Sequence, residues 1–511
     1  MTRAVPVHAA RRLERIRLRP VPSCVIVIFG ASGDLTERKL MPALYALHAE
    51  NVLEKCFGIL GVARSDLSDE SFRAAMKEAV SREADVNEET WGSFEKRLHF
   101  MAADLQDPEA YRALAERLRP LGAGDPRTDN QLYYLAVPSM LMPDIVDGLA
   151  GAGLTAEGEG WTRIVLEKPF GWDLESAREL NARIGRHFQE SQVFRIDHFL
   201  GKETVQNILA FRFANAIFEP VWNRGAIDYV EITAAETIGV GDRAAFYEDT
   251  GALRDVLGNH MLQLLALVAM EPPAAYDPDA VREEKVQVLR SIRPFTAEEV
   301  RDRTVRGQFG PGVVEGREAS GYRELEGVAP DSGTETYAAV DFRVDNWRWQ
   351  GVPFYLRTGK RLARRVSEIA VHLKPAPSAL FSGDGGSEPN LVVIRMAPDQ
   401  GIDVVFRAKV PGEEMKTTDV RMEFDYQEAF GVEIPEAYET LLLDAIEGDV
   451  THFLRADEVE AQWQLVDPIA ETWSAEPPPG FPDYASGSEG PVAANDLVAR
   501  NGHSWRSLEE P

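Results

Sequence analysis

The sequence predicts an α/β part followed by an α+β part: a Rossmann-like, doubly wound parallel sheet at the N-terminus, then a large, mostly antiparallel sheet with helices. Short, continuous apolar runs alternate with helical segments between residues 24 and 169. A glycine-rich turn follows the first of these runs. Later segments alternate apolar and polar residues, which is typical of antiparallel strands with one solvated face. We therefore expect two folded units with a crevice between them.

The first unit is predicted from the order strand, glycine-rich turn, helix, strand. The run CVIVIF at 24–29 is short and β-branched, as expected for a strand that is buried on both faces. It ends at Gly30, a helical pattern follows, and a second apolar run covers 57–62. This order defines a βαβ unit. Because similar runs recur between 131 and 169, we assign 23–203 to one dinucleotide-binding domain.

The second unit, 204–511, is predicted to be a large α+β domain. A helix rich in leucine and methionine is expected at 251–270, with Asp249 or Thr250 as its N-cap. A short strand at 228–236 is expected to join the alternating segments, which read TYAAVDFRVDN, FYLRTG, EIAVHLKP, NLVVIRMAP and DVVFRAKVP. Stretches rich in Gly, Ser or Pro are expected to be loops, at 381–387, 477–482 and 484–490.

The amino-acid composition argues against several classes of partner. The chain has 511 residues, with 55 Lys and Arg against 83 Asp and Glu, and a formal net charge of −28. This charge argues against a partner that is a nucleic acid or an anionic membrane. No apolar run is long enough to cross a bilayer. An anionic ligand would have to be held by local clusters of basic residues.

The cysteines and the N-terminal segment indicate in which cellular compartment the protein is expected. Cys24 and Cys56 both lie in apolar runs and are too few for a disulfide framework, so we expect buried, reduced thiols. Residues 1–22 are rich in arginine and lack an apolar core. A solvated basic tail is the favoured interpretation, and an organellar transit peptide is the alternative. We expect a cytoplasmic protein.

The glycine-rich turn suits a phosphate. Its glycines would let the backbone approach closely, and the following helix offers free N–H groups. The spacing is G-x-x-G, so a purely structural turn is an equal alternative. Arg64 and Ser65 follow the next strand, where an arginine suits the 2′-phosphate of NADP; an ordinary surface arginine is the alternative. The turn comprises Gly30, Ala31, Ser32, Gly33, Asp34 and Leu35.

Two segments gather basic residues near the expected crevice. Lys168 follows the run at 162–166, at the sheet edge where ligands bind in open α/β folds. The segment 195–203 contains Asp197, His198 and Lys202. On a helix, His198 and Lys202 would share a face and could bind one phosphate. A solvated charged face is the alternative, and Gly201 between them argues against a regular helix.

His260 lies at the edge of the apolar stripe of the helix expected at 251–270. It could be a general base, or a packed core histidine. The chain has no Cys/His cluster at the spacing of zinc ligands, so no metal is expected.

Six motifs in this order resemble the glucose-6-phosphate dehydrogenase family: GASGDL, VARS, EKPFG, RIDHFLGKE, GALRDV and GVPFYLRTGK. The resemblance runs from about Val25 to the C-terminal HSWR segment, and RIDHFLGKE is the most specific motif. It implies oxidation of D-glucose 6-phosphate to 6-phospho-D-glucono-1,5-lactone with NADP, the first step of the oxidative pentose phosphate pathway. It also implies a homodimer or homotetramer and a Lys168–Pro169 bond that could be cis.

The resemblance also assigns roles to residues. His260 would be the catalytic base, oriented by Asp197, and Lys168 would contact both sugar and coenzyme. The remaining substrate residues would be His198 and Lys202 for the phosphate, Glu236 and Asp255 for sugar hydroxyls, and Lys360 and Arg365 to complete the anion site. The coenzyme would contact Gly30, Ala31, Ser32, Gly33, Asp34, Leu35 and Arg64, with Asp104 and Leu105 in a less specific segment.

The chain departs from the family pattern at three places near these residues. One is the segment before the helix expected at 251–270, which reads AAFYEDT and not the glycine-rich form of the family. Phe199 stands where the family usually has tyrosine, which removes one hydroxyl directed at the phosphate. Gly258 replaces the usual glutamine before Asn259 and His260. The alternatives to the main interpretation are use of NAD, another hexose phosphate as substrate, or a catalytically silent relative. The last would be expected to lack the base or the lysines, and His260, Lys168 and Lys202 are present.

Overall fold

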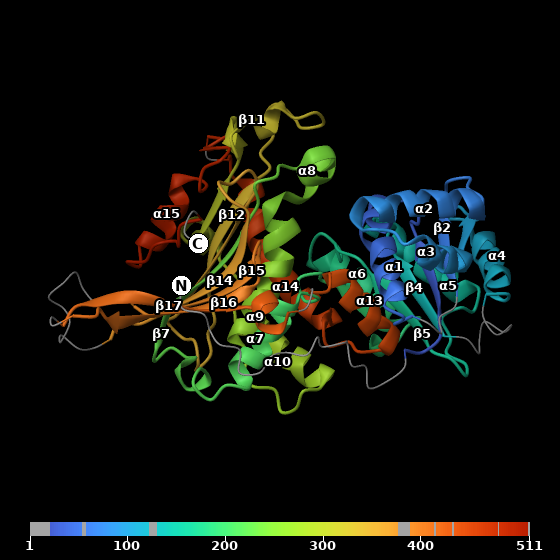
Figure 1. Cartoon of the computed structure of the whole chain (residues 1–511). Helices are drawn as coiled ribbons and strands as arrows, with labels where there is room; N and C mark the ends of the chain where they lie inside the picture. The colour runs from blue at the N-terminus through green and yellow to red at the C-terminus, as the bar shows by residue number, and fades with distance from the viewer. Residues whose placement is uncertain are drawn as a thin grey trace.

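Two sheets organise the chain, one largely parallel and one mostly antiparallel (Figure 1). The computed structural model describes residues 21–53, 58–121, 130–376, 389–412, 415–431, 434–478 and 480–508. Three expectations lie outside these residues: the thiol of Cys56, the loop at 381–387 and nearly all of the basic tail at 1–22. Both predicted sheet types are confirmed.

The N-terminal sheet has the order β18-β6-β5-β4-β1-β2-β3. Strands β1 to β6 all pair in parallel, in the order of a dinucleotide-binding fold. The short strand β18, Phe453–Leu454, returns from the C-terminal half and pairs antiparallel to β6. The parallel strands are β1 Val25–Phe29, β2 Ile59–Ala63, β3 Leu98–Ala102, β4 Gln131–Leu135, β5 Thr162–Leu166 and β6 Val193–Ile196.

Helices cover both faces of this sheet, because alternate residues of each strand are apolar on opposite faces. Ile26 and Ile28 pack with α1, α2, α3 and α13, whereas Val25 and Val27 pack with α4, α5 and α6. These helices are α1 Met41–Ala49, α2 Asp69–Glu83, α3 Glu88–Phe94, α4 Pro108–Leu118, α5 Met142–Gly151, α6 Leu174–Ile184 and α13 Ala437–Glu447. The π-helix η1, Thr36–Leu40, precedes α1.

The second sheet has the order β17-β16-β15-β14-β7-β13-β12-β8. Its pairs are antiparallel except that β7 and β13 run in parallel. The predicted strand at 228–236 is β7, in the interior of the sheet. The strands are β7 Ile227–Ala235, β8 Thr304–Gly307, β12 Tyr337–Arg343, β13 Pro353–Gly359, β14 Val366–Leu373, β15 Leu391–Ala397, β16 Gly401–Lys409 and β17 Thr417–Asp425.

Helices α8, α9 and α14 lie on the side of the second sheet that faces the N-terminal domain, and α15 lies on the other side (Figure 1). The helices of this half are α7 Glu203–Phe213, α8 Ala244–Ala252, the π-helix η7 Leu253–Met261, α9 Leu262–Ala269, α10 Pro278–Arg290, α11 Ala297–Arg303, α12 Tyr426–Phe430, α14 Ala456–Ala475 and α15 Val492–Ala499. The short 3-10 turns are η2 Glu95–Arg97, η3 Ser139–Leu141, η4 Glu190–Gln192, η5 Glu219–Val221, η6 Gly241–Arg243 and η8 Tyr322–Glu324.

Short strand pairs complete the second half. The hairpin of β10, Gly312–Val314, and β11, Arg317–Ala319, is antiparallel. Strand β9, Phe309–Gly310, pairs in parallel with β19, Tyr484–Ala485. The loop expected at 484–490 therefore begins with a strand.

The predicted N-cap at Asp249 or Thr250 is wrong. Both residues lie inside α8, and the break comes at Gly251, which has φ of +60°. The N–H of Leu253 donates to the carboxylate of Glu335 at 3.0 Å. A side chain distant in the sequence thus satisfies an N–H group that would otherwise lack a partner at the start of η7.

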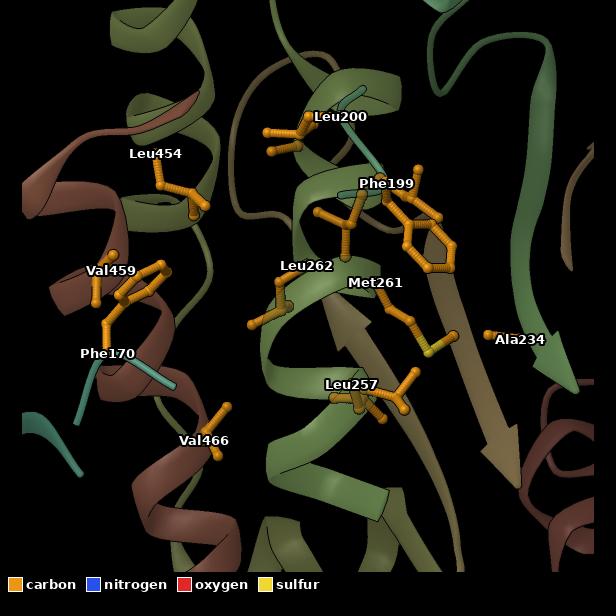
Figure 2. Packing of buried hydrophobic residues seen from close by; sticks show 14 of the residues in the cluster. Phe170, Phe199, Leu200, Ala234, Leu257, Met261, Leu262, Leu454, Val459 and Val466 are labelled. Atoms are coloured by element: carbon orange, nitrogen blue, oxygen red, sulfur yellow. The ribbon is translucent and has the colours of Figure 1, made fainter. Parts of the chain in front are cut away.

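Helix α14 packs directly against η7 and α9. Figure 2 shows Val459 and Val466 of α14 on one side of the helix that carries Leu257, Met261 and Leu262. A Cβ on Gly258 would lie 2.9 Å from Val466 Cγ2. The absence of a side chain at Gly258 therefore permits this close approach.

Among the described residues, no helix combines the length and the apolar character needed to cross a membrane.

Candidate active site

The glycine-rich turn lies at the carboxyl edge of the parallel sheet, as predicted. Gly30 directly follows β1 and has φ of +86°, and a Cβ there would overlap the carbonyl oxygen of Ala136. Helical structure begins at Asp34. The turn therefore presents backbone N–H groups and a helix start at the edge where this fold binds phosphates.

The neighbouring strands add side chains at the same edge. Arg64 directly follows β2 and is exposed, and the hydroxyls of Ser32 and Ser65 lie 3.0 Å apart. Asp104 and Leu105 come shortly after β3, and the Leu105 carbonyl accepts a hydrogen bond from Tyr111 at 2.6 Å. The open glycine turn beside an exposed guanidinium fits the pyrophosphate and 2′-phosphate of NADP.

Lys168 and Asp197 are neighbours because they follow adjacent parallel strands. Strands β5 and β6 pair Leu166 with Arg195, and Lys168 and Asp197 follow directly after the ends of these strands. The Lys168–Pro169 peptide bond is cis. From the other half, η7 places His260 between the two residues.

The hydrogen bonds of His260 define its tautomer. Nδ1 is bonded to a carboxylate oxygen of Asp197, and Nε2 lies 2.9 Å from Lys168 Nζ. A carboxylate only accepts and an ammonium only donates. Nδ1 therefore carries the proton, and the unprotonated Nε2 accepts a hydrogen bond from Lys168 through its lone pair.

Burial and charge set the protonation of this group. His260 and Asp197 are both nearly inaccessible to solvent. Burial and the Lys168 ammonium lower the pKa of His260, while Asp197 acts in the opposite direction. His260 and its hydrogen bond hold the pKa of Asp197 well below its usual value although burial opposes this. At neutral pH the pair is a neutral imidazole beside a carboxylate.

Asp255 lies on the other side of Lys168. Lys168 Nζ contacts the Asp255 carbonyl at 2.7 Å and its carboxylate at 3.2 Å. Although burial opposes it, the charges of Lys168 and Lys360 hold the pKa of Asp255 well below its usual value. An ionised Asp255 can accept a hydrogen bond from a sugar hydroxyl.

The hypothesis that His198 and Lys202 share a helix face is wrong. Residues 198–202 form a turn, and α7 starts only at Glu203. A Cβ on Gly201 would lie 2.6 Å from the Ala437 carbonyl oxygen. Lys202 still acts electrostatically on His198, so the turn keeps both side chains in one region.

Phe199 connects this turn to His260. Its ring is stacked on the His260 ring, with centroids 4.4 Å apart and planes at 17°. The Lys202 ammonium lies 3.9 Å from the centroid of the same ring, within the range of a cation–π contact. Burial and the charge of Arg365 lower the pKa of Lys202 to about 8.

The second sheet supplies Glu236, Lys360 and Arg365. Glu236 and Lys360 follow the parallel strands β7 and β13, which pair Ala235 with Gly359, and their side chains form an ion pair. Arg365 directly precedes β14, whose Val366 also pairs with Ala235. The parallel pair of β7 and β13 thus brings Glu236 and Lys360 together.

Asp197, His198 and His260 place potential ligand atoms within 4.8 Å of one another. A cation at this place would meet the Lys168 ammonium, which is bonded to His260. The arrangement is therefore better suited to proton transfer than to binding a metal.

Two contributors to the site were missed in the sequence. Glu167 is buried beside Lys168, and Tyr438 lies against His198. Glu167 stands in the EKPFG motif, which could have drawn attention to it. Nothing in the sequence connects Tyr438 with the turn at 198–202.

A dinucleotide site and an Asp–His pair surrounded by cations define a dehydrogenase that acts on an anionic substrate. Family models agree: "Glucose-6-phosphate dehydrogenase, NAD binding domain" matches 27–207, and the C-terminal domain of the same family matches 209–506. This chain belongs to the glucose-6-phosphate dehydrogenase family, whose oxidoreductases use NADP.

Curated and solved relatives extend over nearly the whole chain. Glucose-6-phosphate 1-dehydrogenase of Aggregatibacter actinomycetemcomitans is 46% identical over 484 residues, covering 95% of this chain and 97% of the relative. The Mycobacterium avium enzyme structure is 37% identical with a TM-score of 0.83, covering 96% and 100%. A glucose-6-phosphate dehydrogenase in complex with its substrate glucose 6-phosphate is 33% identical with a TM-score of 0.87, covering 96% and 100%.

Replacing Lys168 should change the titration of His260. In Lys168→Gln the ammonium that disfavours imidazolium is lost, so we expect the pKa of His260 to rise. The acid limb of the pH profile of kcat should move to higher pH, because His260 then protonates earlier as pH falls. Lys168→Arg keeps the charge and is the matched control. An acid limb that stays in place in Lys168→Gln would show that the limb does not report His260.

Proposed function

We propose that this chain oxidises D-glucose 6-phosphate to 6-phospho-D-glucono-1,5-lactone, the first step of the oxidative pentose phosphate pathway, with His260 as the base. The observation that carries the assignment of the base is the unprotonated Nε2 of His260, which follows from the Nδ1 bond to Asp197 and the contact of Nε2 with the Lys168 ammonium. The nearly complete burial of the pair excludes bulk water from the proton acceptor.

The chemistry needs a proton acceptor at the C1 hydroxyl while hydride leaves C1. The hydroxyl would take the place at Nε2 where Lys168 Nζ lies at 2.9 Å, and its proton would pass to Nε2. Asp197 then stabilises the imidazolium through Nδ1–H. Lys168, displaced from Nε2, keeps its contacts with Asp255 and can bond the sugar oxygens. When bound, the nicotinamide of NADP accepts the hydride.

Basic residues are assigned to the phosphate of the substrate, and carboxylates are assigned to its hydroxyls. We assign the phosphate to His198, Lys202 and Arg365, because Lys202 acts electrostatically on His198 and Arg365 on Lys202. Lys202 and Arg365 supply positive charge, and a neutral His198 can donate a hydrogen bond. Glu236 and Asp255 are assigned to sugar hydroxyls, with Lys360 holding Glu236 in place. These local positive charges overcome the overall negative charge of the chain at short range.

Arg64 is assigned to the 2′-phosphate of NADP. It is exposed directly after β2, beside the turn that starts at Gly30. The other coenzyme residues predicted at 30–35, 104 and 105 follow the first and third strands of the same edge.

We propose that the enzyme assembles as a homodimer or homotetramer through the second sheet. Strands β16 and β17 project from the body (Figure 1), and β17 is the edge strand of its sheet. Met422 on β17 is 62% exposed. Exposed edge strands favour pairing with another chain. Sedimentation velocity of the wild type and of Met422→Asp tests this: the wild type should be an assembly that the variant weakens, and a wild-type monomer would contradict the proposal.

Two further expectations remain proposals. We retain the division into a coenzyme domain at 23–203 and a substrate domain at 204–511, although β18 of the second part joins the first sheet. The low cysteine content suits a reducing compartment, which supports a cytoplasmic location.

Removing the imidazole should abolish proton transfer without removing substrate binding. For His260→Ala we expect kcat to fall by about 10²- to 10⁴-fold with little change in KM, because the loss is confined to the transition state. Asp197→Asn should show a milder loss, since it disturbs the orientation of the base.

The control for His260→Ala is His372→Ala. His372 is a partly buried histidine on β14 that pairs with Glu231 in the second sheet. Its loss should lower the melting temperature with near-normal kcat per folded enzyme. A folded His260→Ala enzyme with more than about a tenth of normal turnover would contradict the assignment of the base.

Arg64→Ala should weaken NADP much more than NAD. We expect KM for NADP to rise roughly 10- to 100-fold, as for loss of a charge-assisted hydrogen bond worth about 1.5–3 kcal/mol. Arg112→Ala removes an exposed arginine from α4 and serves as control. Equal effects of Arg64→Ala on both coenzymes would exclude Arg64 as a 2′-phosphate ligand.

A further inference from the structure

A buried carboxyl group beside the catalytic lysine has no part in the mechanism above. Glu167 follows β5, directly before Lys168, and is 9% exposed. The Tyr134 hydroxyl donates to its Oε1 at 2.5 Å, and the Tyr438 hydroxyl is a second hydrogen-bond partner. Burial raises the pKa of Glu167 to about 7. Burying a carboxyl group is energetically unfavourable, so its presence here requires a structural or functional explanation.

The two tyrosines come from different parts of the molecule. Tyr134 is on β4 of the parallel sheet, whereas Tyr438 is in the first turn of α13, which arrives from the C-terminal half. Glu167 thus joins the coenzyme-domain sheet to a helix that the chain adds almost three hundred residues later.

The first turn of α13 lies directly against the turn that carries His198 and Lys202. Gly201 has no room for a Cβ because the Ala437 carbonyl oxygen would be 2.6 Å away. The ring of Tyr438 is nearly parallel to that of His198, with centroids 6.3 Å apart and planes at 9°. This is an offset-stacked arrangement.

We propose that Tyr438, held by Glu167, is a positioning residue for His198 and therefore for the phosphate of the substrate. The inference rests on the proposed role of His198 and Lys202 as phosphate ligands. It adds a residue that acts on the phosphate site without contacting the phosphate.

The hydrogen bond to Glu167 separates positioning from direct binding. A phenol carries one proton, and Tyr438 shares it with Glu167. We therefore assign its contribution to the flat ring, which lies parallel to that of His198, and not to a bond between its hydroxyl and the phosphate.

Within its own segment, His198 meets the ring of Phe199 edge-on, with centroids 5.1 Å apart and planes at 66°. It lies in a turn, and the second torsion of a histidine side chain is broad. His260 meets the His198 ring edge-on, with centroids 4.6 Å apart and planes at 78°. Tyr438 supplies a parallel neighbour, so the two contacts together restrict the orientation of the imidazole.

The test compares phosphorylated and free sugar. In Tyr438→Leu we expect the ratio of kcat/KM for glucose 6-phosphate to kcat/KM for glucose to fall by about tenfold, with KM for NADP unchanged. Tyr438→Phe keeps the ring but loses the bond to Glu167, and Glu167→Gln weakens that bond. Both variants should lower the ratio of the two kcat/KM values, but by less than Tyr438→Leu does. Inorganic phosphate, as a competitive inhibitor, should bind Tyr438→Leu more weakly.

Two reference variants make the outcome decisive. Tyr426→Leu removes a buried tyrosine of α12 and should leave the ratio unchanged. Lys202→Ala should lower the ratio strongly. If Lys202→Ala lowers it and Tyr438→Leu does not, the positioning role is wrong. If Lys202→Ala leaves the ratio unchanged, the phosphate assignment itself fails. Equal loss with both sugars in Tyr438→Leu would show only a packing role and would also overturn the inference.

Discussion

The bond between the Asp197 carboxylate and His260 Nδ1 is the interaction on which the account of the site depends. It fixes the tautomer in which Nε2 is unprotonated, and it provides a negative charge beside the imidazolium that forms during the reaction. It can do this only in a dry environment, where the charge of one carboxylate is not screened. His260 is part of η7, and Phe199 stacks on its imidazole. These two constraints fix the orientation of the ring, and the bond to Asp197 fixes its protonation.

Parallel strand pairs bring the groups of the site together. In the first sheet, β5 and β6 end side by side and deliver Lys168 and Asp197. In the second sheet, the only parallel pair among the described strands of that sheet, β7 and β13, delivers Glu236 and Lys360. Parallel neighbours end at the same edge, whereas antiparallel neighbours end at opposite edges. Groups from both sheets therefore reach the site without long loops.

The sequence predicted what local pattern controls. The apolar runs located β1, β2, β4 and β5 of the coenzyme domain but not β3 and β6. The alternating segments and the run at 228–236 located the strands of the second sheet except β8 and β17. It could not predict contacts made between distant segments: Glu335 at the start of η7, the return of β18 to the first sheet, or Tyr438 against His198. The shared helix face considered for His198 and Lys202 is absent because residues 198–202 form a turn, in which Gly201 lies against Ala437 of α13. The residue roles came from family motifs, and only the structure related them in space.

The most direct test of the account is the protonation of the two ring nitrogens of His260. In enzyme labelled with ¹⁵N-histidine, comparison with His260→Ala identifies the His260 signals. The account predicts a protonated Nδ1 and an unprotonated Nε2 at neutral pH. In Asp197→Asn, the signal of the Nδ1 proton should lose the shift that its hydrogen bond to the carboxylate causes. A protonated Nε2 with a bare Nδ1, or an imidazolium at neutral pH, would contradict the account.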